Sequence, residues 1–300
     1  MSGEESWNHG HAEANGIRVH YVRQGSGTPL VLLHGWPEFW FVWRKNIPAL
    51  AERFDVIAPD LRGFGESEKP PLPEPPGGLL DELVEDLRGL ADALGIERFG
   101  IVSHDVGSFV AQRFAARYPE RVLGLFFFNC VYPGIGRRWL EPESVREIWY
   151  QSFHQQPWAA DLVGSSREAC GIYLKHFLDH WADEPGVFDE DFEAWVDNFM
   201  RPGNLRGGFD WYVGVGEARM KMMREGAPDL PKIQPPAYLL WGESDPILKV
   251  RWADRLGDYF ADFELEPATG AGHFVHYERP ELANGRITRF FSGGCKVHCV

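Results

Sequence analysis

The sequence predicts an α/β domain with a mostly parallel sheet, interrupted by an all-helical insertion. Short apolar runs without alternation are typical of strands that a parallel sheet buries on both faces. Four such runs, separated by helix-like patterns, span residues 29–33, 55–58, 99–103 and 122–128. The pattern then changes: residues 132–232 contain aromatic, helix-like stretches, and strand-like runs return only at 237–241 and 263–266. One domain with an insertion explains this order better than two domains in tandem.

These elements divide the chain into a core, an insertion and two tails. An outer strand is expected at 17–23, where apolar and polar residues alternate. The clearest helix, at 79–94, repeats apolar residues every three or four positions and ends before Gly95. Further helices are expected at 139–153, 166–181, 189–199, 209–223 and 280–291. The resulting parts are a flexible tail at 1–15, a core domain at 16–131 and 233–292, a helical cap at 132–232 and a second tail at 293–300.

Composition limits the partners and the setting. The 300 residues include 30 basic and 44 acidic ones, and the net charge of −14 argues against nucleic acid and anionic membranes as partners. No apolar stretch approaches the roughly 18 residues of a membrane span, and the N-terminus does not resemble a secretory signal. The scattered cysteines favour a cytoplasmic setting. Cys295, His298 and Cys299 could suggest a metal site, but a disordered terminus is the simpler interpretation.

The most informative motif surrounds Asp105. A predicted buried strand ends at His104, a helix begins after Asp105, and the small residues Ser103 and Gly107 flank the junction. This is the spacing of a nucleophile elbow, a tight strand-to-helix turn that presents one reactive side chain. A helix N-terminus also favours an anion at this point. An ordinary N-cap aspartate is the alternative interpretation.

Two further strand ends carry partners for such a nucleophile. Asp245 follows the predicted strand at 237–241, and His273 follows the one at 263–266 within a glycine-flanked loop. The order nucleophile, acid, histidine matches a hydrolytic triad, and parallel sheets place their sites at carboxyl ends of strands. His276 is a competitor for His273. Asn129 also ends a strand, but it is not acidic and cannot replace Asp245.

A third strand-end loop, His34-Gly35-Trp36-Pro37, supplies backbone donors. The N–H groups of Trp36 and Val106 are suited to form an oxyanion hole. The Trp36–Pro37 bond is a candidate cis peptide. A plain proline turn is the alternative.

Together these motifs resemble the epoxide hydrolase and dehalogenase branch of the α/β-hydrolases, from about residue 16 to 291. The resembling segments are His34-Gly-Trp-Pro-Glu, Asp60-Leu-Arg-Gly-Phe-Gly-Glu-Ser67, Ser103-His-Asp-Val-Gly and Gly272-His-Phe. The resemblance implies an α/β-hydrolase fold with an eight-stranded sheet, an aspartate nucleophile and no metal or organic cofactor. Two cap segments, at 150–157 and 204–212, are similar to those of epoxide hydrolases. They imply that Tyr150 and Tyr212 bind the epoxide oxygen, although both could be core aromatics.

The implied activity is hydrolysis of a small-molecule epoxide to a diol through an alkyl ester on Asp105. His273, oriented by Asp245, would then activate water, with activity falling below its pKa, roughly 6.5 if unperturbed. Trp36, Phe39, Trp149 and His154 are expected to line the substrate pocket.

The rival activity is a dehalogenase that uses the same nucleophile. The residues that usually hold halide or carboxylate beside that nucleophile are replaced here by Val106 and Phe109. A non-catalytic ligand receptor is the remote alternative. The sequence does not predict the oligomeric state.

Overall fold

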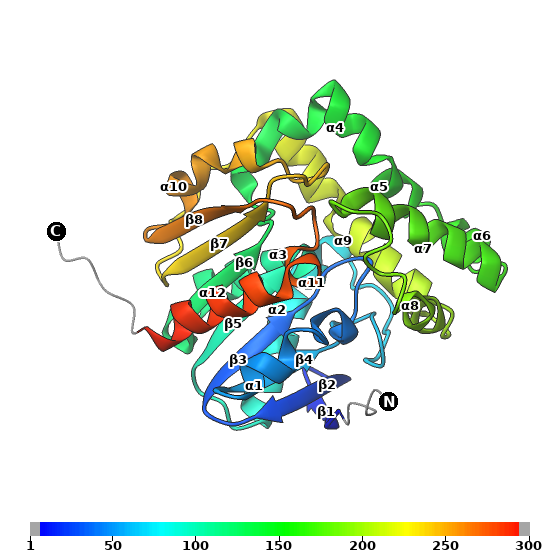
Figure 1. Cartoon of the computed structure of the whole chain (residues 1–300). Helices are drawn as coiled ribbons and strands as arrows, with labels where there is room; N and C mark the ends of the chain where they lie inside the picture. The colour runs from blue at the N-terminus through cyan, green and yellow to red at the C-terminus, as the bar shows by residue number, and fades with distance from the viewer. Residues whose placement is uncertain (1–6, 294–300) are drawn as a thin grey trace.

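A computed structural model describes residues 7–293 and contains one mixed sheet of eight strands. The strand order is β1-β2-β4-β3-β5-β6-β7-β8 (Figure 1). The strands β1 and β2 are antiparallel to their neighbours, and every pairing from β4 to β8 is parallel. Their bounds are β1 His9–Ala14, β2 Ile17–Gly25, β3 Thr28–Leu33, β4 Phe54–Pro59, β5 Phe99–His104, β6 Val122–Phe128, β7 Ala237–Gly242 and β8 Phe263–Ala268. This architecture confirms the predicted fold class.

The prediction of a flexible tail at 1–15 is wrong for residues 9–14, which form the edge strand β1. A two-residue turn, Asn15-Gly16, joins β1 to β2 with positive φ at both positions (48° and 76°). Asn-Gly is the sequence that such hairpin turns favour. The strand expected at the outer edge is therefore second in the sheet. The remaining tail residues, 1–6, and the candidate metal ligands Cys295, His298 and Cys299 lie outside the described residues.

Helices cover both faces of the sheet. On one face lie α1 (Ile47–Ala51) and α12 (Pro280–Ser292), and on the other lie α2 (Leu79–Ala93) and α3 (Val106–Arg117) (Figure 1). The central strand β5 is buried along its whole length, which explains its unbroken apolar run. A short helix α10 (Leu256–Tyr259) precedes β8, and α11 (Val275–Glu278) follows it.

Between β6 and β7 the chain forms only helices and loops over residues 132–232. These helices lie together to one side of the sheet (Figure 1). The expected helix at 139–153 is broken, because Pro142 begins a new helix and cannot continue the preceding one. The helices are η4 (Pro133–Leu140), α4 (Pro142–Glu147), α5 (Trp149–Phe153), α6 (Ala159–Val163), α7 (Arg167–Trp181), α8 (Phe192–Phe199) and α9 (Asn204–Glu225).

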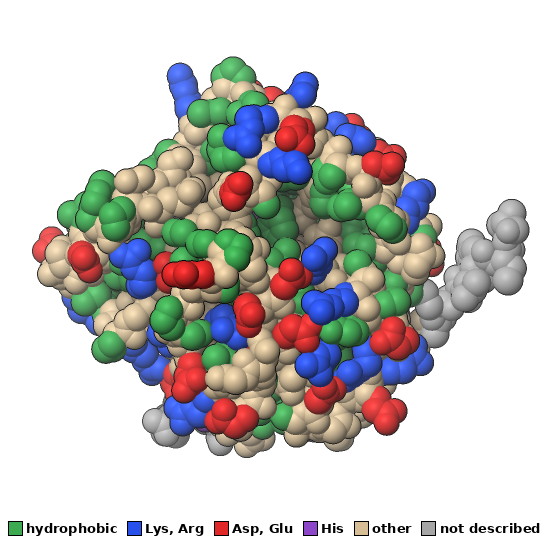
Figure 2. Space-filling view, turned by 180° about the vertical axis from the view of Figure 1, so that it is seen from behind, with side chains coloured by type: hydrophobic (Ala, Val, Ile, Leu, Met, Phe, Trp, Pro, Cys, Tyr) green, Lys and Arg blue, Asp and Glu red, His purple; other side chains and the backbone are tan. Residues whose placement is uncertain are grey.

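The surface mixes both signs of charge. On the face seen from behind, Lys and Arg alternate with Asp and Glu around a central hollow that has hydrophobic side chains at its bottom (Figure 2). Within residues 7–293, no helix has the length and apolar character needed to cross a membrane.

Candidate active site

Asp105 occupies a strained turn between β5 and α3. Its φ of 44° and ψ of −112° fall in a region that non-glycine residues rarely adopt. The small Gly107 makes the turn possible, because a Cβ there would lie 2.4 Å from the carbonyl oxygen of Leu33. Such strain is typical of functional sites and does not suit an ordinary N-cap, and no cap hydrogen bond from the Asp105 side chain is formed.

The loop after β3 meets this carboxylate. The Trp36 N–H donates a hydrogen bond of 2.9 Å to Asp105 Oδ1. Gly35 allows the approach, since a Cβ there would come within 2.3 Å of Asp105 Cβ. The peptide bond before Pro37 is cis. Val106, the other expected donor, is the first residue of α3.

His273 and Asp245 form a buried pair beside the turn that carries Asp105. His273 Nδ1 is 2.8 Å from Asp245 Oδ2, and both side chains are buried. Asp245 Oδ1 accepts the N–H groups of Ile247 and Leu248 at 2.7 and 2.9 Å, which fixes the carboxylate. His273 Nε2 is buried and makes no hydrogen bond to the described residues. It is therefore available to a water molecule or a substrate.

Asn129 is a component that the sequence analysis did not assign. Its Nδ2 donates to Asp245 Oδ2 at 2.5 Å and to the Gly272 carbonyl at 3.1 Å, and its Oδ1 accepts the Gly242 N–H at 3.0 Å. It is fully buried and has a φ of 43°. The side chain thus links the ends of β6 and β7 to the loop that carries His273. Its place at the end of a strand was visible in the sequence, but only acidic residues were considered for that role.

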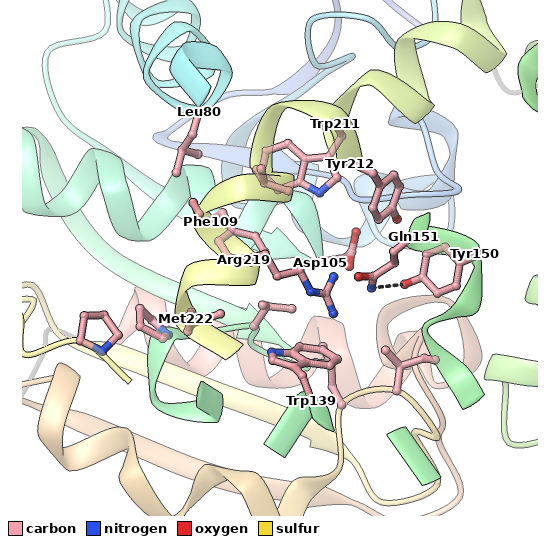
Figure 3. A pocket seen from close by; sticks show the side chains of 17 residues that line it. Leu80, Asp105, Phe109, Trp139, Tyr150, Gln151, Trp211, Tyr212, Arg219 and Met222 are labelled. Carbon is pink, nitrogen blue, oxygen red and sulfur yellow. Dashed lines mark hydrogen bonds between the residues drawn. The ribbon is translucent and has the colours of Figure 1, made fainter. Parts of the chain in front are cut away.

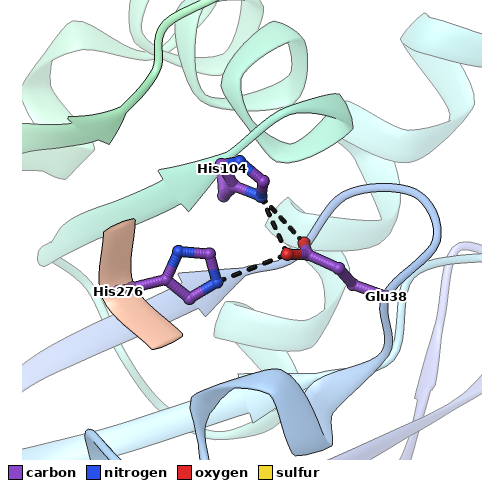
Figure 4. A group of neighbouring side chains, drawn as sticks. All are labelled: Glu38, His104 and His276. Carbon is purple, nitrogen blue, oxygen red and sulfur yellow. Dashed lines mark hydrogen bonds and ion pairs between the residues drawn. The ribbon is translucent and has the colours of Figure 1, made fainter. Parts of the chain in front are cut away.

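The competing histidine, His276, belongs to another cluster. Figure 4 shows His276 and His104 on either side of Glu38, whose Oε1 is 2.9 Å from His104 Nδ1 and 3.3 Å from His276 Nε2. Glu38 Oε2 also accepts the Gly35 N–H at 2.6 Å, so this group fixes the loop beside Asp105. Burial lowers the pKa of His276 to about 4, although Glu38 opposes the shift.

These three side chains could also be considered as metal ligands. Glu38, His104 and His276 place one ligand atom each within 4.8 Å of the others. The hydrogen bonds just described account for the Glu38 carboxylate without an ion. We therefore treat the cluster as a structural support of the loop.

Two tyrosines of the helical segment 132–232 face Asp105 across a cavity of about 240 Å³ (Figure 3). The ring centroids of Tyr150 and Tyr212 are 5.5 Å apart, and the rings are nearly perpendicular. Gln151 Nε2 donates to the Tyr150 hydroxyl oxygen at 3.0 Å. The side chains that line the cavity are mostly apolar. The exceptions carry a charge, a hydroxyl or an amide, and they are Asp105, Tyr150, Gln151, Tyr212 and Arg219. Gln151 and Arg219 were not predicted from the sequence.

The expected pocket residues lie elsewhere, and this part of the prediction is wrong. Phe39 packs against Trp195 at a centroid distance of 5.6 Å, and the Trp149 side chain is 45% exposed at the surface. His154 stacks on Phe209 and shares a 2.7 Å hydrogen bond with the Tyr173 hydroxyl. None of these three lines the cavity.

Trp36 contributes to the site through its backbone. Its indole is not among the side chains that line the cavity, but stacks on the Tyr150 ring at 5.4 Å, with an 11° angle between the planes. The Tyr150 ring thus covers the loop that carries the Trp36 N–H.

The electrostatic environment sets the protonation states. Burial opposes the charged form of His273, but Asp245, with a smaller effect of Asp105, outweighs it and raises the pKa to about 9. The pKa of an unperturbed histidine is roughly 6.5, so the two carboxylates favour the charged imidazolium in the free enzyme. Burial raises the pKa of Tyr150 and Tyr212, and the charge of Asp105 raises both further. Both phenols therefore keep their protons at neutral pH.

Known proteins with similar sequences are hydrolases. Residues 28–165 match the family model described as alpha/beta hydrolase fold. A soluble epoxide hydrolase of Corynebacterium sp. (strain C12) is 36% identical over 293 residues, which cover 95% of this chain and 97% of that protein. The chain belongs to the epoxide hydrolase family.

Other members of the epoxide hydrolase family extend the match. Epoxide hydrolase 4 of Homo sapiens is 30% identical over 92% of this chain and 76% of that protein. The solved structure of the epoxide hydrolase CorEH without ligand superposes with a TM-score of 0.83 at 34% identity, covering 96% of this chain and 99% of CorEH. The resemblance predicted from the motifs is therefore confirmed, and the chain is a hydrolase of this family.

Proposed function

We propose that this enzyme hydrolyses an epoxide to a vicinal diol through a covalent ester on Asp105. The observation that carries the proposal is the arrangement across one cavity. A carboxylate on a strained elbow faces two buried, protonated phenols, and a histidine–aspartate pair lies beside it. We also propose residues 132–232 as the cap of this site.

In the first half-reaction, the Asp105 carboxylate attacks one ring carbon and the carbon–oxygen bond breaks. The Trp36 N–H holds one carboxylate oxygen, which orients the other. Tyr150 and Tyr212 donate hydrogen bonds to the leaving oxygen, and one of them supplies its proton. Because the Gln151 amide donates to the Tyr150 oxygen, the Tyr150 proton can be directed to the substrate.

In the second half-reaction, His273 removes a proton from water, the hydroxide attacks the ester carbonyl of Asp105, and the bond between that carbonyl carbon and the substrate-bound oxygen breaks. The released diol alkoxide takes a proton from the His273 imidazolium, and the proton of the new Asp105 carboxylic acid returns to the tyrosinate. Asp245 stabilises the resulting imidazolium. We assign the oxyanion to the N–H groups of Trp36 and Val106. Loss of the Asp105 charge in the ester removes one of the effects that raise the His273 pKa, so the ester itself promotes the neutral base.

The test uses the variant His273→Gln with an excess of styrene oxide. We expect intact-mass spectrometry to find an adduct on this variant and none on Asp105→Asn. Wild-type enzyme in excess, in a single turnover in heavy-oxygen water, should give a diol without solvent oxygen, because the new oxygen comes from Asp105. Solvent oxygen in that first diol would disprove the covalent scheme.

The same experiments distinguish the dehalogenase. Halide release from short haloalkanes, with no diol from any epoxide, would replace this proposal by the rival activity. Tight ligand binding without turnover would favour the receptor. We further propose a cytoplasmic setting, because Cys130 and Cys170 are free and buried.

A further inference from the structure

Arg219 places a cation in the proposed active-site cavity, and no carboxylate of the described residues forms an ion pair with it. It lies on α9, seven residues after Tyr212, so both side chains leave the same face of the helix. Figure 3 shows its guanidinium group directed into the cavity between Asp105 and Trp139. Its Nε and Nη2 are inaccessible to solvent and form no hydrogen bond within residues 7–293.

The guanidinium is held by its face, which leaves its edges free. Its Cζ lies 4.3 Å from the centre of the Trp139 ring. Trp139 is buried and packs edge-on against Trp252, so the platform is fixed. A stacked arginine keeps its N–H donors in the plane of the group, where they can bind a ligand.

Leaving these donors unpaired is costly. Buried charges in proteins are normally paired, and a methionine of similar length would fill the same space without a charge. Burial lowers the pKa of Arg219, and the electrostatic effects of Tyr150, Tyr212 and Asp105 offset this shift only in part. The environment therefore lacks a counter-ion that contacts the guanidinium.

We propose that Arg219 binds a carboxylate of the substrate, and that the enzyme prefers epoxides that carry a carboxylate a few carbon atoms from the ring. This inference rests on the epoxide hydrolysis proposed above and names its substrate class. Tyr212 and Tyr150 would hold the ring oxygen, while Arg219 would hold the other end of the molecule.

Three features favour a short carboxylate over other ligands. Guanidinium groups bind carboxylates through two parallel hydrogen bonds. Among the described side chains that line the cavity, Arg219 is the one cation, and a single cation suits a ligand with one negative charge. The cavity volume of about 240 Å³ lies below the usual range for ligand sites, so the substrate is compact. The seven residues from Tyr212 to Arg219 span about 10 Å of helix. This spacing limits the distance between the epoxide ring and the carboxylate of the substrate.

The test compares short epoxyalkanoates with their primary amides, which have nearly the same shape but no charge. Styrene oxide serves as the neutral reference. The variants are Arg219→Met, Arg219→Lys and, as a control for charge loss on the same helix, Lys221→Met. Lys221 is 68% exposed and 4.0 Å from Glu225. Calorimetric binding of the matching saturated acid and amide gives a readout that does not need turnover.

We expect the wild type to favour the acid over the amide at least ten-fold in kcat/KM. Arg219→Met should abolish this preference and the binding of the saturated acid. Its loss of kcat/KM on the acid should exceed its loss on styrene oxide at least ten-fold. Lys221→Met should behave as wild type. Equal rates for acid and amide in the wild type, or an equal loss on all substrates in Arg219→Met, would overturn the proposal. Acid binding that depends on Arg219, without turnover of any epoxide, would support the carboxylate site and refute the hydrolase function instead.

Discussion

Replacing Asn129 by alanine tests whether this residue holds the histidine loop in place. The variant leaves two buried backbone groups, the Gly242 N–H and the Gly272 carbonyl, without the partners seen here. Each unsatisfied buried group costs about 1–3 kcal/mol. An alanine at a φ of 43° adds about 1–2 kcal/mol of backbone strain. We therefore expect the free energy of unfolding to fall by about 3–8 kcal/mol.

The catalytic effect is expected to exceed what stability explains. Asp245 also loses its 2.5 Å donor, so the orientation of His273 loosens. A displacement of the order of 1 Å can reduce the rate roughly 100-fold. Diol formation from styrene oxide measures kcat, and urea unfolding followed by tryptophan fluorescence measures the free energy.

Two controls separate hydrogen bonding from strain. Asn129→Gly relieves the positive φ but not the lost bonds, so it should remain nearly as impaired as the alanine variant. Asn15→Ala places the same substitution at a φ of 48° in the β1–β2 turn, where the side chain also loses hydrogen bonds to Glu82 and Asp86, so it controls for an asparagine-to-alanine change at positive φ outside the site. If Asn129→Ala were no less stable or active than Asn15→Ala, the assignment of Asn129 as a positioning residue would be refuted.

Three further outcomes are expected. The double variant Tyr150→Phe with Tyr212→Phe should lose diol formation at least 100-fold without loss of folding, because phenylalanine keeps the packing but cannot donate a proton; near-normal rates would show that the phenols only pack. NMR should titrate His273 near pH 9 in the free enzyme, whereas the kcat profile, limited by ester hydrolysis, should fall with decreasing pH around a lower apparent pKa, since the base must be neutral. If the pKa of His273 measured by NMR equalled the apparent pKa of the kcat profile, the proposed effect of the Asp105 charge on His273 would be contradicted. Gly35→Ala should inactivate the enzyme, because its Cβ would collide with the nucleophile, while the exposed Gly285→Ala on α12 should keep full activity.

The positions of Asp105, Asp245 and His273 could be predicted from the sequence because a parallel sheet fixes where the ends of its strands lie. A nucleophile, an acid and a histidine that follow three parallel strands must meet at one edge, whatever the side-chain details. Gly107 indicated a tight turn, and the structure shows the reason, since a Cβ there would lie 2.4 Å from the carbonyl oxygen of Leu33. The edge strand β1 was missed although its Asn15-Gly16 turn gave a clear hairpin signal.

The side chains of residues 132–232 that line the cavity could not be predicted in the same way, because helix rotation and tertiary packing decide which of them face it. Trp149 and Tyr150 are neighbours in sequence, yet one is 45% exposed and the other 3%. His154, one turn later, packs inside the cap instead of facing the cavity. Arg219 resembled a solvated charge on an amphipathic helix. Its spacing of two turns from Tyr212 was the signal that could have revealed it.

The contact between helix α7 and the histidine loop has a consequence for protein engineering. The carbonyl oxygen of Trp181, the last residue of α7, accepts the His273 N–H at 2.7 Å. A Cβ on Gly272 would lie 2.3 Å from the same oxygen. Grafting the helical segment 132–232 from a homologue is therefore expected to displace the His273 loop unless residues 270–273 are exchanged with it, so successful chimeras should carry both segments from one parent.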